Sequence, residues 1–166
     1  MESISPARLY EDQREELHLE LLTESLASRR EITVSDTNRP GMALMGFVEN
    51  FLSERIQILA QTEFAYLATL PEAQMREAVG RLFQFSIPLI VVCKALNVPP
   101  YLIQLANECQ VPVLRTPEST TPFIHSLTLY LDHMFAPSTS VHASLVDVYG
   151  CGLLFTGQSG IGKSET

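Results

Sequence analysis

A glycine-rich run near the C-terminal end limits the folds that this sequence can form. Residues 157–164 read G-Q-S-G-I-G-K-S and match the phosphate-loop pattern G-x-x-x-x-G-K-[ST] at every fixed position. The glycines let the backbone curl so that successive N–H groups point toward phosphate oxygens. Such a loop follows a strand and opens a helix, so this part of the chain is expected to adopt an α/β arrangement.

The loop predicts a site for ATP and Mg²⁺. Lys163 would reach the β- and γ-phosphates, and the hydroxyl of Ser164 would bind the metal ion. The residues expected to hold the cofactor are Gly157, Gln158, Ser159, Gly160, Ile161, Gly162, Lys163 and Ser164. The sequence ends at Thr166, shortly after the motif, so we expect this 166-residue chain to bind nucleotide weakly or not at all.

A β-hairpin is expected immediately before the loop. Val141 to Tyr149 and Leu153 to Thr156 have strand-like patterns, and Gly150-Cys151-Gly152 resembles a tight turn. Pairing symmetrically about Cys151 would place His142 opposite roughly residue 160, beside the phosphate loop. A histidine there could be structural or could contact a phosphate or a reacting hydroxyl, and the pattern alone leaves both roles open.

The preceding chain alternates strand-like and helix-like segments, which predicts an α/β domain with a largely parallel sheet and flanking helices. Leucines spaced from Leu17 to Leu26 predict an amphipathic helix. The expected strands are residues 32–34, 55–59, 88–93 and 111–114, and the expected helices are residues 63–70, 72–85, 99–109 and 119–135. We expect a first domain at residues 1–135, a linker at 136–140, and the start of a second domain at 141–166.

Two further side chains have competing interpretations. Arg115 follows a strand, at the edge where open α/β sheets bind ligands, but a surface arginine is the favoured interpretation. Asp147 could line the phosphate site, but a solvated strand residue is favoured.

Composition excludes several classes of partner. The sequence is 46% hydrophobic and has a formal charge of −8, from 11 Lys and Arg against 19 Asp and Glu. This acidic balance argues against nucleic-acid or anionic-membrane binding, because both need clustered cations. The densest apolar run, Ile87 to Cys93, is far shorter than the ~20 residues that span a bilayer. With three scattered cysteines, the sequence predicts a reduced, cytoplasmic protein.

Around the phosphate loop, the sequence resembles the HPr kinase/phosphorylase family. The resemblance rests on Val141-His142, on the run Leu145 to Gly150, and on Gly157 to Glu165, supported by Arg39-Pro40-Gly41 and by residues 55–63. It implies a first domain similar to the N-terminal domain of Mur ligases and a second, P-loop kinase domain that this chain only begins. It also implies that His142 and Lys163 are active-site residues and that Ser164 binds Mg²⁺.

The resemblance further implies the activity and the partners. Members use Mg-ATP to phosphorylate a serine of the phosphocarrier protein HPr, and they remove that phosphate with inorganic phosphate, releasing pyrophosphate. They regulate sugar uptake and carbon metabolism and assemble as hexamers. Two alternatives stay open: another P-loop kinase or ATPase, and a non-catalytic domain that senses a ligand or holds subunits together.

Overall fold

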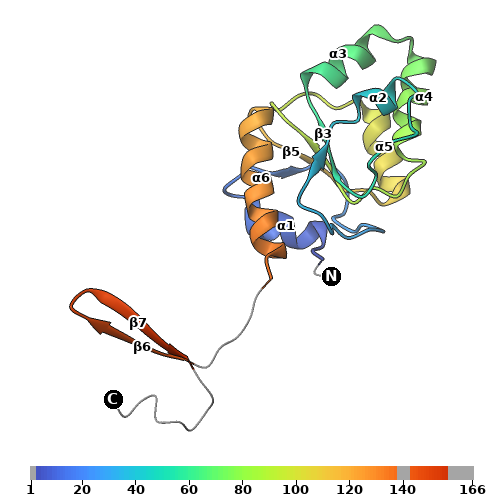
Figure 1. Cartoon of the computed structure of the whole chain (residues 1–166). Helices are drawn as coiled ribbons and strands as arrows, with labels where there is room; N and C mark the ends of the chain where they lie inside the picture. The colour runs from blue at the N-terminus through green and yellow to red at the C-terminus, as the bar shows by residue number, and fades with distance from the viewer. Residues whose placement is uncertain (1–2, 138–142, 157–166) are drawn as a thin grey trace. The chain divides into compact units, whose positions relative to one another are not determined.

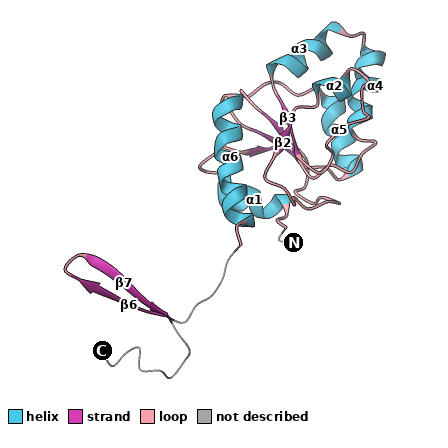
Figure 2. Ribbon diagram, in the orientation of Figure 1, coloured by secondary structure: helices cyan, strands magenta, loops and turns pink. Residues whose placement is uncertain are grey.

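The computed structural model describes residues 3–137 and 143–156. The chain divides into two compact units, Met1–Phe135 and Ala136–Thr166 (Figure 1). The first unit contains a five-stranded sheet covered by helices, and the second contains a two-stranded hairpin (Figure 2).

The sheet of the first unit is parallel except at one edge. Its strands lie in the order β1-β5-β4-β3-β2, and β1 alone pairs antiparallel with its neighbour. The strands are β1 (Glu20–Leu21), β2 (Thr37–Asn38), β3 (Ile56–Leu59), β4 (Ile90–Val92) and β5 (Val113–Arg115). The helices are α1 (Pro6–Gln13), α2 (Gly41–Leu44), α3 (Gln61–Thr69), α4 (Glu72–Leu82), α5 (Pro100–Cys109) and α6 (Thr120–Phe135).

Helices cover both faces of this sheet and bury two hydrophobic clusters (Figure 1). One cluster lies under α1 and α6, and the other lies under α2, α3, α4 and α5. Successive strand residues point to opposite faces, so Val91 joins the first cluster and Val92 the second. This two-sided burial explains why the β4 segment is continuously apolar. It confirms the expected α/β fold with a mostly parallel sheet and flanking helices.

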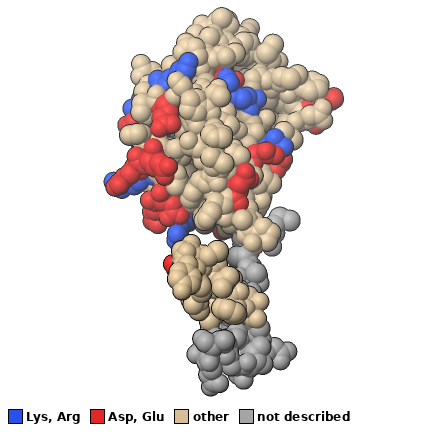
Figure 3. Space-filling model, turned by 60° about the vertical axis from the view of Figure 1, so that its left-hand side comes forward, with Lys and Arg blue, Asp and Glu red and all other residues tan. Residues whose placement is uncertain are grey.

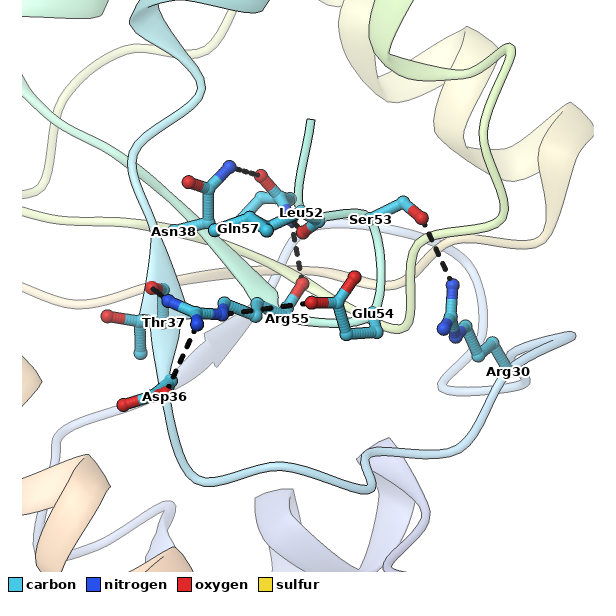
Figure 4. A network of polar contacts seen from close by, with 9 residues as sticks. All are labelled: Arg30, Asp36, Thr37, Asn38, Leu52, Ser53, Glu54, Arg55 and Gln57. Carbon is cyan, nitrogen blue, oxygen red and sulfur yellow. Dashed lines mark hydrogen bonds and ion pairs between the residues drawn. The ribbon is translucent and has the colours of Figure 1, made fainter. Parts of the chain in front are cut away.

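The β3 strand is buried on both faces, which differs from the cover mainly on one face that an alternation of polar and apolar residues favours. The difference is due to Gln57, which is fully buried and hydrogen-bonded at both ends of its amide (Figure 4). Its Nε2 donates to the carbonyls of Leu52 (2.9 Å) and Arg55 (2.8 Å), and its Oε1 accepts from Asn38 (2.8 Å). A buried amide that is satisfied in this way substitutes for an apolar residue.

Proline and hydroxyl residues set several helix limits as expected. Pro71 separates α3 from α4, Pro100 occupies the first turn of α5, and α6 begins at Thr120 and ends at Phe135. Strands β4 and β5 fall inside or within a residue of the segments predicted for them.

The prediction of a leucine-rich helix over Leu17–Leu26 was wrong. Helix α1 ends at Gln13, before the first of these leucines, and the chain then turns at His18, whose φ is 49°. Leu17 and Leu19 are buried, and the hydroxyl of Thr116 donates to the carbonyl of Leu17 (2.7 Å). The segment instead forms β1 along β5. The predicted strand at residues 32–34 was also wrong, because it is reduced to an isolated bridge between Ile32 and Ile4.

Candidate functional site

The residues that sequence analysis assigned to the nucleotide site lie outside the described part of the chain. They are His142, Gly157, Gln158, Ser159, Gly160, Ile161, Gly162, Lys163 and Ser164. The structure describes the hairpin that lies between His142 and Gly157 in the chain, which consists of β6 (Ala143–Val148) and β7 (Cys151–Thr156). These strands are antiparallel, with Ala143 paired to Thr156 and Val148 to Cys151.

The hairpin turns earlier than the sequence had predicted. The loop is Tyr149-Gly150, with φ values of 52° and 79°, and not Gly150-Cys151-Gly152. Positive φ at both positions is the signature of a type I′ turn, whose twist matches that of the flanking strands. The carboxylate of Asp147 accepts a hydrogen bond from the Gly150 N–H (2.8 Å), which closes the turn. The pairing about Cys151, from which His142 was placed opposite residue 160, was therefore wrong.

In the sequence, His142 and Gly157 nevertheless adjoin two residues that pair with each other at the open end of the hairpin. His142 precedes Ala143, Gly157 follows Thr156, and Ala143 and Thr156 are cross-strand partners. The phosphate-loop sequence thus directly follows a strand, as its pattern requires.

The hairpin surface is almost uncharged. Asp147 is the sole charged residue between Ala143 and Thr156, and the strands are mostly tan in Figure 3. Several large apolar side chains are exposed, including Leu145 (73%) and Leu154 (59%). A two-stranded hairpin is marginally stable in water unless another element covers one of its faces.

A second group of polar residues gathers in the first unit, and sequence analysis missed it. Arg39 follows β2, Glu63 lies in the first turn of α3, and Lys94 follows β4. Arg39 donates from Nε and Nη2 to the buried carboxylate of Glu63, at 2.6–3.1 Å. Glu63 also accepts from the N–H of Ala60 (3.0 Å). The signal in the sequence was positional: each residue comes just after a parallel strand, and the carboxyl ends of such strands meet at one edge of the sheet.

Neighbouring residues of this edge have structural roles. Arg115 donates to Glu20 at 2.6 and 2.9 Å and thus joins β5 to β1. Cys93 is fully buried, and this burial raises the pKa of its thiol to about 11. The Cys93 thiol is therefore neutral at pH 7 and is not an activated nucleophile.

A mostly parallel α/β unit is thus followed in the chain by a hairpin and by a sequence that matches the phosphate-loop pattern. A family model described as HPr Serine kinase N terminus matches residues 4–131, and one described as HPr Serine kinase C-terminal domain matches residues 133–166. The chain belongs to the HPr serine kinase family.

Its curated relatives include proteins named HPr kinase/phosphorylase. The one from Thermoanaerobacter sp. (strain X514) is 42% identical over 151 residues, which cover 91% of this chain and 50% of the relative. The one from Caldanaerobacter subterraneus subsp. tengcongensis is 40% identical over 166 residues, covering 100% of this chain and 53% of the relative. The one from Geobacillus thermodenitrificans is 43% identical over 152 residues, covering 92% and 49%. The chain thus spans about half the length of the curated relatives it matches.

The chain is also similar to a solved structure of the CBS and DRTGG domains of the regulatory region of Clostridium perfringens pyrophosphatase, complexed with the activator diadenosine tetraphosphate. It matches with a TM-score of 0.44 and 15% identity, over 71% of this chain and 45% of that chain. Within the described residues, no helix is long and apolar enough to cross a membrane.

Proposed function

We propose that the protein to which this chain belongs transfers a phosphoryl group between ATP and a serine of the phosphocarrier protein HPr. In the forward reaction the serine oxygen bonds to the γ-phosphorus, the bond to the β-phosphate oxygen breaks, and ADP leaves. In the second reaction an oxygen of inorganic phosphate bonds to the phosphoserine phosphorus and the bond to the serine oxygen breaks. That oxygen takes a proton from the attacking phosphate, which restores the serine hydroxyl, and pyrophosphate leaves. The proposal is carried by the phosphate-loop sequence directly after β7, within the segment that matches the kinase C-terminal family model.

The donor set of the loop sequence fits a magnesium nucleotide. The ammonium of Lys163 would neutralise charge on the β- and γ-phosphates, and the glycine-rich backbone would donate N–H groups to their oxygens. The hydroxyl of Ser164 would be a ligand for Mg²⁺. The metal ion, when bound, supplies positive charge that stabilises the transferring phosphoryl group.

We further propose that His142 acts beside this loop, where it contacts a phosphate or the reacting serine hydroxyl. The support is its chain position: it adjoins Ala143, whose cross-strand partner Thr156 adjoins Gly157. An imidazole titrates near neutral pH, so it can accept the proton of the serine hydroxyl.

The organisation that we propose follows the family. Residues 1–135 form an N-terminal domain, 136–140 a linker, and 141–166 the start of the kinase domain. The assembled enzyme is a hexamer that works in the cytoplasm, where it acts on HPr and on inorganic phosphate. The 166-residue chain alone is expected to be inactive.

The test is an assay of the full-length protein with purified HPr and Mg-ATP, read by the mass of HPr. We expect one added phosphate on a serine of HPr. In the Lys163→Ala variant we expect the rate of phosphoryl transfer to fall at least about 100-fold, because the charge of the γ-phosphate is no longer neutralised. Adding inorganic phosphate to phosphorylated HPr should then release pyrophosphate.

Circular dichroism of Lys163→Ala serves as the folding control, since a loop lysine contributes little to a core. Unchanged turnover in this variant would remove Lys163 from the reaction. Measurable ATP binding with no mass added to HPr would favour another substrate or a ligand-sensing role.

A further inference from the structure

A cavity of about 280 Å³ opens at the carboxyl edge of the first unit's sheet. Four consecutive parallel strands contribute to its lining through the residues that follow them. Arg39 follows β2, Gln61 and Thr62 follow β3, Lys94 follows β4, and Ser119 to Pro122 follow β5. The cavity lies wholly within the first compact unit.

The topology of the sheet creates this opening. The chain leaves β4 toward α5, which packs on one face of the sheet, and leaves β5 toward α6, which packs on the other (Figure 1). Two adjacent strands whose connections diverge to opposite faces leave a crevice outside their carboxyl ends. Open α/β sheets bind their ligands in crevices of this kind.

The lining of the cavity is cationic, although the chain as a whole is acidic. Arg39 and Lys94 contribute positive charge, and no carboxylate residue lines the cavity. The buried carboxylate of Glu63 neutralises Arg39, so the uncompensated positive charge of the lining is that of Lys94, which forms no ion pair among the described residues. Glu118 faces His18 at 3.4 Å.

The two cations are held in different ways. Arg39 uses Nε and Nη2 for Glu63, which fixes the guanidinium plane and leaves Nη1 without a hydrogen bond among the described residues. Lys94 has a φ of 63°, and its N–H donates to the carbonyl of Glu118 (2.9 Å). None of the ion pairs within residues 3–137 and 143–156 involves the Lys94 ammonium.

Neutral donors complete the lining. Thr62, Ser119, Thr120 and Thr121 bring hydroxyl groups to it from the first turns of α3 and α6 and the residue before α6. The N-cap of α3 is Ala60, which makes no side-chain cap hydrogen bond. The first-turn N–H groups of α3 therefore lack the oxygen that a serine or aspartate cap would supply.

We propose that this cavity binds a phosphate group, either as inorganic phosphate or as the end of a small phosphate monoester. A phosphate group would find matching donors in the ammonium of Lys94, in the remaining Nη1 of Arg39, in several hydroxyls and in the first-turn amides of α3. The volume, just below the usual range for drug-sized ligands, suits a phosphate group with a small substituent. The site does not depend on the kinase proposal, because none of its residues belongs to the phosphate loop.

The test is an NMR titration of the ¹⁵N-labelled 166-residue chain carrying Lys163→Ala, so that the loop lysine is absent from every sample. Sodium phosphate and glycerol 2-phosphate are added in parallel at constant ionic strength. We expect saturable shifts at the amides of Gln61, Thr62, Thr120 and Thr121. Tighter binding of the monoester would identify a phosphate monoester as the occupant, and equal or tighter binding of phosphate would identify the free anion; both support the site.

The decisive variant is Lys94→Asn, because asparagine tolerates a positive φ and removes the ammonium. We expect its dissociation constant for phosphate to rise at least about tenfold, as for a lost charge-assisted contact. Lys94→Gly, which adopts this φ without strain, is the second variant and should behave alike. Arg8→Gln on α1 removes an equal charge away from the cavity and should change the constant less than about twofold. The absence of saturable shifts at the four amides, or unchanged affinity in both Lys94 variants, would overturn the proposal.

Discussion

Asp12 on α1 accepts hydrogen bonds from Arg8 of the same helix (2.7 Å) and from the Tyr130 hydroxyl of α6 (2.8 Å). The Arg8 hydrogen bond, followed by that of Tyr130, lowers the pKa of Asp12 below its ordinary 3.8. Burial, followed by the hydrogen bond to Asp12, raises the pKa of Tyr130 above its ordinary 10.0. The lowered pKa of Asp12 adds stability above pH 3.8 that is lost as pH falls through the lowered value. The raised pKa of Tyr130 adds stability below pH 10.0 that is lost as pH rises through the raised value.

Tyr130→Phe tests this contact at the scale of single residues. We expect the pKa of Asp12, followed by NMR of its side-chain carboxyl carbon, to move up toward 3.8 but to stay below it, because Arg8 remains. We also expect the loss of unfolding free energy above pH 10.0 to become smaller in urea denaturation, because one tyrosine with a raised pKa is gone. Tyr10→Phe on α1 is the matched control, since no hydrogen bond of the Tyr10 hydroxyl occurs among the described residues. An Asp12 pKa that did not move in Tyr130→Phe would contradict the assignment.

At the scale of elements, local signals predicted the helices better than the edges of the sheet. Pro71 and the hydroxyl-rich start of α6 act on their own neighbours, so sequence alone located those helix limits. The pairing of Glu20 with Arg115 joins residues far apart in the chain, and no local pattern encodes it. For that reason the leucine spacing around Leu17 and Leu21 was mistaken for a helix. Residues of the cation-lined cavity were missed for a related reason: they gather only when four strand ends align.

Two glycines offer a prediction about helix α4 and its surroundings. Gly80 lies in α4, and a Cβ there would meet nothing within 4 Å. Gly80→Ala should raise the unfolding free energy by about 0.5–1 kcal/mol, because glycine loses more backbone entropy in a helix than alanine does. Urea denaturation measures the change. Gly46→Ala is the opposite control: with φ at +106°, alanine there is strained and should lower stability by about 1–2 kcal/mol. A stabilised Gly46→Ala would contradict the backbone argument.

At the scale of the whole molecule, both hydrophobic clusters are built from residues of the first unit. Helix α6 closes one of them with Phe123, Leu127 and Leu131, all fully buried. Each such side chain contributes about 2 kcal/mol by leaving water, so the three together contribute about 6 kcal/mol. That sum is comparable with the total stability of a typical domain. The unit should therefore need α6, whereas none of its core residues comes from the hairpin.

Two shortened chains test this division. A chain ending at Phe135 should unfold cooperatively in urea, with a midpoint close to that of the 166-residue chain, because both clusters are intact. A chain ending at Glu118 lacks α6 and should be unfolded or molten, because Leu114, Val91 and Cys93 would lose their cover on that face. Near-ultraviolet circular dichroism distinguishes packed from molten side chains. If the chain ending at Phe135 were itself molten, the first unit would depend on contacts beyond its own residues, and the domain limit proposed at residue 135 would be wrong.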